Sequence, residues 1–185
     1  MRPEECTLYH SGLKGAEATF GALAERWGVK EVVFTYEGHT PDRARNLVVL
    51  SEEELKRGDI SMELVSKMMK RNYAKPERIR KVLQVIFHMV NKGYQVFIVG
   101  EILPNQTVKG GTGWAAELAK LFNRPLHVFD QKQEKWFTWQ EGKWVEDNPK
   151  ITHQTFVGTG TRYLTEAGQK AIEDLFERSF AGASQ

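Results

Sequence analysis

The stretch Tyr94-Gln-Val-Phe-Ile-Val99, followed by Gly100-Glu101, decides the fold of this chain. A continuous apolar run of this kind is typical of a parallel strand that helices cover on both faces. A helical segment and a second apolar run, residues 126–129, come after it. This order predicts a strand–helix–strand unit with residues 94–99 near the centre of the sheet.

The same alternation of strands and helices extends from this centre to both ends of the chain. Before it we expect strands at residues 6–10, 29–36 and 46–50 and helices at 16–27, 60–72 and 76–92. After it we expect a helix from about residue 112, an aromatic hairpin at 135–146, a short strand at 155–157, a loop at 158–162 and a last helix capped by Thr165. The sequence therefore predicts a single α/β domain over residues 1–185, with a Rossmann-like, mainly parallel sheet, helices on both faces and a short aromatic β-hairpin.

Composition excludes several classes of protein. Hydrophobic residues make up 41% of the 185 residues and charged residues 27%, which is typical of a packed globular chain rather than a disordered one. Cys6 is the single cysteine, so an intramolecular disulfide is excluded and a reducing, cytoplasmic location is expected. We expect no membrane segment, because every purely apolar run is short. The five histidines lack the spacing of metal ligands, so no metal is predicted.

The positive charge of the chain is concentrated in one segment. Residues 67–92 hold eight basic side chains and one acidic one, a net charge of +7, whereas the whole chain carries +2. One interpretation is the solvated face of a helix. The other is a surface that attracts a phosphorylated ligand or a nucleic acid.

Small and polar residues follow the predicted strands directly. In an open α/β sheet the carboxyl ends of parallel strands share one edge, and ligands bind in the crevice there. The sequence therefore predicts a ligand site at this edge. Its candidate residues are Ser11, Gly12, Gly15, His39, Gly100, Glu101, Asp130, Gly158, Thr159, Gly160 and Arg162.

The segment Lys109-Gly110-Gly111-Thr112-Gly113 comes immediately before a predicted helix. Glycines let the backbone approach a ligand closely, and the amides at a helix N-terminus favour an anion such as phosphate. Glu117 lies about one turn inside the helix, where its carboxylate can bind ribose hydroxyls, and a sugar phosphate is therefore the expected ligand. Two alternatives stay open: the glycines form a tight turn that serves packing, and Glu117 compensates the helix dipole.

The predicted hairpin contains four aromatic residues, Trp136, Phe137, Trp139 and Trp144. They can stack on a base, cover a dimer contact or stiffen the hairpin itself.

Residues 110–117, Gly-Gly-Thr-Gly-Trp-Ala-Ala-Glu, are similar to the Lonely guy signature Pro-Gly-Gly-x-Gly-Thr-x-x-Glu. Lys109 stands in place of its proline and Trp114 in place of its threonine. With HSGLKGAE near the start and FVGTGTR near the end, the chain resembles the SLOG superfamily of Rossmann-like nucleotide-binding proteins. The resemblance implies a homodimer and makes Glu117 the candidate catalytic residue for cleaving the N-glycosidic bond of a nucleoside monophosphate. Arg71 or Arg78 approximates the arginine of that family.

The sequence therefore predicts a protein that binds a nucleotide or another phosphorylated small molecule at its glycine-rich loops, without a cofactor. Phosphoribohydrolase-like activity is the possible chemistry. The alternative is a nucleic-acid-binding module that uses the basic segment 67–92.

Overall fold

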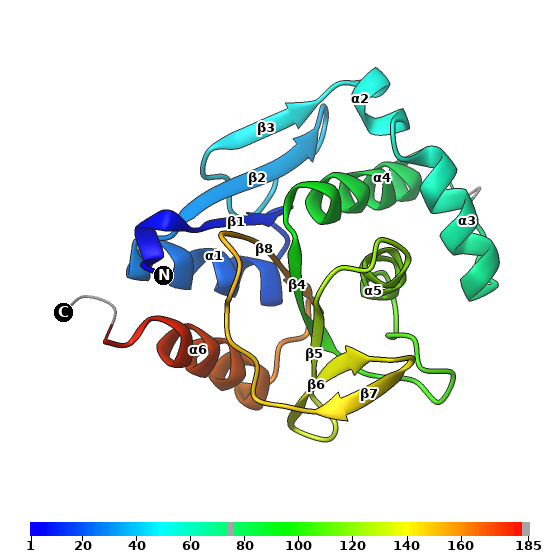
Figure 1. Cartoon of the computed structure of the whole chain (residues 1–185). Helices are drawn as coiled ribbons and strands as arrows, with labels where there is room; N and C mark the ends of the chain where they lie inside the picture. Colours follow the sequence, from blue (N-terminus) through cyan, green and yellow to red (C-terminus); the bar gives the residue numbers. More distant parts are fainter. Residues whose placement is uncertain (74–75, 183–185) are drawn as a thin grey trace.

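Six parallel strands and one antiparallel hairpin form a single sheet in the computed structural model, which describes residues 1–73 and 76–182 (Figure 1). The order across the sheet is β3-β2-β1-β8-β4-β5-β6-β7. The strands are β1 (Thr7–His10), β2 (Lys30–Tyr36), β3 (Leu47–Leu50), β4 (Gln95–Gly100), β5 (Leu126–Asp130), β6 (Lys135–Gln140), β7 (Lys143–Glu146) and β8 (Thr155–Gly160). The expected Rossmann-like α/β architecture is confirmed.

Helices cover both faces of this sheet. One face packs against α1 and α6, and the other packs against α4 and α5, with α3 lying outside these two helices (Figure 1). The helical segments are the 3₁₀ turn η1 (Pro3–Glu5), α1 (Ala16–Trp27), α2 (Glu52–Lys56), α3 (Asp59–Met69), α4 (Glu77–Lys92), α5 (Thr112–Leu121) and α6 (Glu166–Phe180). Within the described ranges, none of these helices has the length and apolar character needed to cross a bilayer.

The strand β4 shows why the sheet needs two helical layers. All six of its residues are buried. Val96 and Ile98 join the core beneath α4 and α5, whereas Phe97 and Val99 join the core beneath α1 and α6. Successive side chains of a strand point to opposite faces, so an uninterrupted apolar run requires cover on both.

The last strand, β8, lies between β1 and β4 and pairs in parallel with both. The strand was expected to end at residue 157, and the structure extends it to Gly160. Gly158, Thr159 and Gly160 are therefore strand residues and not part of a loop. In this additional part of β8, Gly158 pairs with Phe97 of β4 and Gly160 pairs with Val99. These residues look like a loop in sequence because small residues are typical of turns, but here they allow close packing.

Two smaller predictions need revision. The helix expected at 60–72 runs from Asp59 to Met69, and it ends at Lys70 in a left-handed conformation. The short helix α2 before it was not predicted, although Ser51 and Glu54 form a complete capping box at its start. The hairpin is confirmed, and its turn residues Glu141 and Gly142 both have positive φ angles, as a two-residue hairpin turn requires.

Candidate binding site at the carboxyl edge of the sheet

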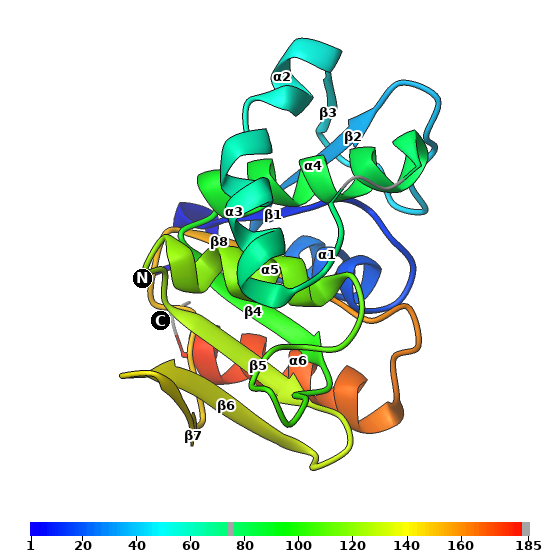
Figure 2. The ribbon, with the colours of Figure 1, turned by 90° about the vertical axis from the view of Figure 1, so that its right-hand side faces the viewer.

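The loops that follow the parallel strands gather at one edge of the molecule, on the right of Figure 2. Helix α1 follows β1 on one face of the sheet, whereas α4 leads from β3 to β4 on the opposite face. A connection that changes faces leaves a crevice between the loop after β1 and the start of α4, and such crevices hold ligands in α/β proteins. The predicted candidate residues lie along this edge or directly beneath it.

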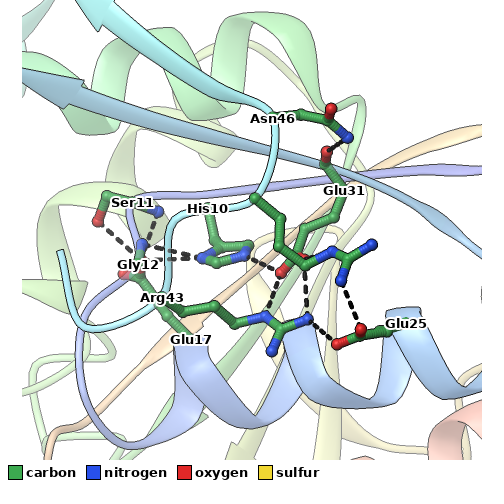
Figure 3. Close-up of polar contacts among 9 residues, drawn as sticks. His10, Ser11, Gly12, Glu17, Glu25, Glu31, Arg43 and Asn46 are labelled. Atoms are coloured by element: carbon green, nitrogen blue, oxygen red, sulfur yellow. Dashed lines mark hydrogen bonds and ion pairs between the residues drawn. The ribbon is translucent and has the colours of Figure 1, made fainter.

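His10, at the end of β1, belongs to a buried polar network (Figure 3). The Gly12 backbone N–H donates to its Nδ1 atom at 2.9 Å. Nδ1 is therefore an acceptor, the ring hydrogen lies on Nε2, and Nε2 donates to Glu31 at 2.6 Å. The imidazole thus links the loop after β1 to the neighbouring strand β2.

Glu31 also receives two hydrogen bonds from Arg43, at 2.7 and 3.0 Å. Burial by itself would raise the pKa of Glu31, but the hydrogen bonds from His10 and Arg43 outweigh burial, and the pKa lies below its usual value. The Glu25 carboxylate binds the same guanidinium at 2.8 Å from α1 (Figure 3). Arg43 therefore fastens the loop after β2 onto β2 and α1.

Glu17 is the second buried carboxylate of this edge. It accepts hydrogen bonds from the Ser11 N–H at 2.6 Å, the Ser11 hydroxyl at 2.7 Å and the Thr159 hydroxyl at 2.8 Å. The hydroxyls of Ser11 and Thr159, both candidate ligand groups, thus have a partner inside the protein. Their contact with a ligand stays a prediction.

Several candidate glycines are required for close packing. Gly12 has φ +74°, and a Cβ there would lie 2.2 Å from the Arg43 carbonyl oxygen. At Gly15, with φ +92°, a Cβ would lie 2.4 Å from the Thr161 carbonyl oxygen. Three further glycines are equally confined. An added Cβ would lie 2.3 Å from the Phe20 ring at Gly158, 2.2 Å from the Val99 carbonyl oxygen at Gly160 and 2.3 Å from the Val108 carbonyl oxygen at Gly113. Packing therefore accounts for these glycines without a ligand.

Gly110 and Gly111 are different, because no atom lies within 4 Å of the position of an added Cβ. Both residues are exposed at the start of α5. Thr112 is the first residue of that helix, and its hydroxyl donates to the Lys109 carbonyl oxygen. The open part of the predicted phosphate loop is therefore Gly110-Gly111, next to the exposed Lys109.

The Arg71 side chain reaches this loop from the end of α3. It donates to the carbonyl oxygens of Gly110, at 2.7 Å, and Val108, at 3.1 Å. Arg71 therefore lies beside the start of α5, and its match to the arginine of the SLOG resemblance stays a prediction. The sequence does not indicate this contact, because 39 residues separate Arg71 from Gly110.

Glu117 is held by neighbouring groups rather than left open. Its carboxylate accepts from the Thr107 hydroxyl at 3.0 Å and pairs with the Lys120 ammonium at 2.8 Å. Lys120 in turn lies 3.9 Å above the ring of Trp139, which packs against Trp144. These contacts attach the helix to the hairpin, so the catalytic role of Glu117 remains a prediction.

The loops after β4 and β5 are tied together by Asp130. Its buried carboxylate accepts hydrogen bonds from the N–H groups of Ile102, Lys132 and Gln133. Gly100 ends β4 beside it, and Glu101 lies 3.9 Å from Lys109. Asp130 therefore shapes the edge, whereas Arg162 after β8 is exposed.

A cavity of about 350 Å³ opens at the end of β2. Its lining comes from the end of β2 and from the first turn of α4. The lining residues are Tyr36, Glu37, Gly38, His39, Thr40, Glu77, Arg78 and Lys81. A smaller cavity, lined in part by Ser11, Leu13 and Val85, shares Tyr36 and His39 with it. The smaller cavity holds only about 10 Å³, so the hollow at the carboxyl edge lies between the end of β2 and the first turn of α4.

Aromatic and cationic side chains meet in the cavity at the end of β2. The rings of Tyr36 and His39 stack with their centroids 5.1 Å apart, and Thr35 bonds the His39 ring. Lys81 pairs with Glu77 at 3.3 Å. The exposed Arg78 forms no ion pair among the residues that the structure describes. The sequence predicted separate roles for Arg78 and His39, and only the fold places them around one cavity.

Some basic side chains of segment 67–92 are paired with acidic groups. Arg80 pairs with Asp59 at 3.4 Å, and Lys81 pairs with Glu77. Lys92 ends α4, about 21 Å along the helix from Arg78 in the first turn, at about 1.5 Å per residue. Lys75 lies outside the described residues. The part that remains exposed near the carboxyl edge includes Arg78.

No group of three or more potential metal ligands occurs within residues 1–73 and 76–182. Comparisons of the chain with protein-family models, with curated proteins and with solved structures find no match. The resemblance to the SLOG superfamily therefore stays a prediction that rests on the residues quoted above.

Proposed function

We propose that this protein binds a nucleotide or a sugar phosphate at the carboxyl edge of its sheet. The observation that carries the proposal is the cavity of about 350 Å³ at the end of β2, where the Tyr36–His39 ring pair and Arg78 line the same space. Aromatic rings and a guanidinium suit a ligand that combines a planar base with phosphate. The cavity lies within the usual range of ligand sites, about 300–1,000 Å³.

The cavity lining holds two cations, Arg78 and Lys81, and two carboxylates, Glu37 and Glu77. These charges balance, so the feature that favours an anion is the helix N-terminus. The cavity includes the first turn of α4, whose N-terminal amides carry partial positive charge. The exposed residues Gly110 and Gly111 lie at the start of the neighbouring helix α5, next to Lys109. Two helix N-termini with nearby cations therefore support phosphate recognition at this edge.

Binding can be tested by calorimetry with nucleoside monophosphates, ribose 5-phosphate and inorganic phosphate. We expect saturable binding that Arg78→Gln weakens about tenfold or more, because one bidentate charged contact is lost. Gly111→Asp places a carboxylate at the start of α5, and we expect it to weaken binding of the phosphate group. Lys92→Gln, at the far end of α4, is the matched control and should leave affinity unchanged.

The absence of binding by every one of these compounds at millimolar concentration would overturn the proposal. Binding that neither Arg78→Gln nor Gly111→Asp reduces would also overturn it, because the ligand would then lie elsewhere. Chromatography of the same samples tests for hydrolysis. Release of free base that Glu117→Ala abolishes would extend the proposal from binding to cleavage of the N-glycosidic bond.

A further inference from the structure

Helix α3 is apolar on two faces. Met62 and Val65 are fully buried in the core beneath it. On the outside, Ile60, Leu64 and Met68 follow one another at four-residue spacing and are 87%, 48% and 53% exposed. Figures 1 and 2 show α3 as an outer layer on α4 and α5, with its outer side uncovered. Three large apolar side chains therefore form a continuous stripe on the molecular surface.

Single exposed apolar residues are normal on a protein surface, but an aligned stripe is not. A helix that is apolar on opposite sides is typical of one that is buried on both. Helix α6 provides the comparison within this chain. Its exposed positions include Lys170, Glu173, Asp174 and Glu177, and its apolar residues lie in the core.

Two opposite charges flank the stripe on one side. Glu63 and Lys67 are both exposed, and neither forms an ion pair within the part of the chain that the structure describes. On a helical projection at 100° per residue, both fall on the same side of Leu64. Glu63 lies toward the N-terminal end of that flank and Lys67 toward the C-terminal end.

We propose that this face of α3 is a homodimer interface, in which the α3 helices of two copies pack antiparallel about a twofold axis near Leu64. Leu64 then faces Leu64 of the second copy, and Ile60 faces its Met68. A twofold axis perpendicular to both helices keeps their charged flanks on the same side. With 1.5 Å of rise per residue, Glu63 comes within about 3 Å along the axis of Lys67 in the second copy.

This charge pattern favours a second copy over an unrelated protein. The antiparallel arrangement creates two symmetric Glu63–Lys67 pairs, whereas a parallel one places the charged flanks on opposite sides. A contact of one helix with another is smaller than the roughly 800 Å² per partner of a standard interface. We therefore expect a dissociation constant on the order of micromolar.

Analytical ultracentrifugation of the full chain from about 1 to about 200 µM tests the proposal across the expected range of affinity. We expect a dimer whose dissociation constant Leu64→Asp raises about 100-fold, because a carboxylate would then face its own copy at the centre of the contact. Leu64 is exposed, so at concentrations below the dissociation constant the variant should keep the melting temperature of the wild-type chain. Val49→Lys is the matched control: Val49 is 55% exposed on the edge strand β3, and the dimer should persist.

Charge reversal tests the antiparallel geometry. Glu63→Lys and Lys67→Glu should each weaken the dimer about tenfold, because each replaces two attractive pairs with two repulsive ones. An equimolar mixture of these two variants should dimerise again, since every pair in the mixed dimer is attractive. The double variant should also dimerise.

Three results would overturn the proposal. The first is a wild-type chain that stays monomeric at the highest concentration. The second is a dimer that Leu64→Asp leaves intact or that Val49→Lys abolishes, which would place the contact on another surface. The third is a mixture of the charge variants that stays monomeric.

Discussion

The network around Glu31 gives the sharpest test of how the loops at the carboxyl edge are held. Glu31→Gln keeps the shape of the side chain and removes its charge. The Glu31 side chain is 2% exposed and accepts three hydrogen bonds, one from His10 and two from Arg43. The amide has one acceptor oxygen, so the substitution leaves at least one of these donors without its partner.

The expected cost follows from burial. Removing one member of a buried ion pair typically costs about 3–5 kcal/mol. Arg43 keeps Glu25 at 2.8 Å and is 18% exposed, so we expect the lower end of that range, about 3 kcal/mol. In a chain of this length, each kcal/mol of lost stability lowers the melting temperature by about 2–4 °C, so we expect a fall of about 6–12 °C.

Thermal denaturation of Glu31→Gln and Glu25→Gln compares the loss of stability at a buried carboxylate with that at an exposed one. Both carboxylates bind Arg43, but Glu25 is 47% exposed, and its substitution should shift the melting temperature far less. Hydrogen exchange adds a local readout, because the N–H groups of Asp42 and Arg43 donate to the Gly12 carbonyl oxygen. Their exchange should accelerate in Glu31→Gln. Equal losses of stability in the two variants would refute the argument from burial.

Three further predictions follow from the same structure. The pKa of Glu31 in the folded protein lies below its ordinary value of 4.5, so the ionised carboxylate contributes fully to the free energy of unfolding above pH 4.5 and loses this contribution as the pH falls through the folded-state pKa. The difference in unfolding free energy between wild type and Glu31→Gln, measured by denaturant unfolding, should therefore become smaller at low pH. A difference that does not change with pH would contradict the assignment. Gly158→Ala should destabilise the protein by about 1–3 kcal/mol through a clash with Phe20, whereas Gly111→Ala should not, and equal melting temperatures for the two variants would count against the packing role of Gly158. Burial lowers the pKa of His127 to about 4, so the chemical shift of its Cε1 proton should stay constant from about pH 8 to about pH 5.5. The free energy of unfolding should decline as the pH falls from 6.5 toward 4, because the unfolded chain binds a proton in this range and the folded chain does not. An NMR titration midpoint near pH 6.5 would show that the ring is accessible to water.

The fold could be predicted because its determinants are local in the chain. The apolar run of β4, the stripe of α4 between Pro76 and Gly93, and the Glu141-Gly142 turn each follow from spacing or backbone preference. The place of β8 between β1 and β4 could not be predicted, because the order of strands depends on contacts between distant segments.

The candidate site divides in the same way. The sequence by itself placed polar and glycine residues after parallel strands, and this placement predicts a ligand site at the carboxyl edge of the sheet. The sequence could not separate glycines that meet Phe20 or a carbonyl oxygen from Gly110 and Gly111, which meet nothing. Nor could it assign Glu17 and Glu31 to buried networks, or bring His39 beside Arg78. Those distinctions depend on which atoms become neighbours after folding, and only tertiary packing decides that.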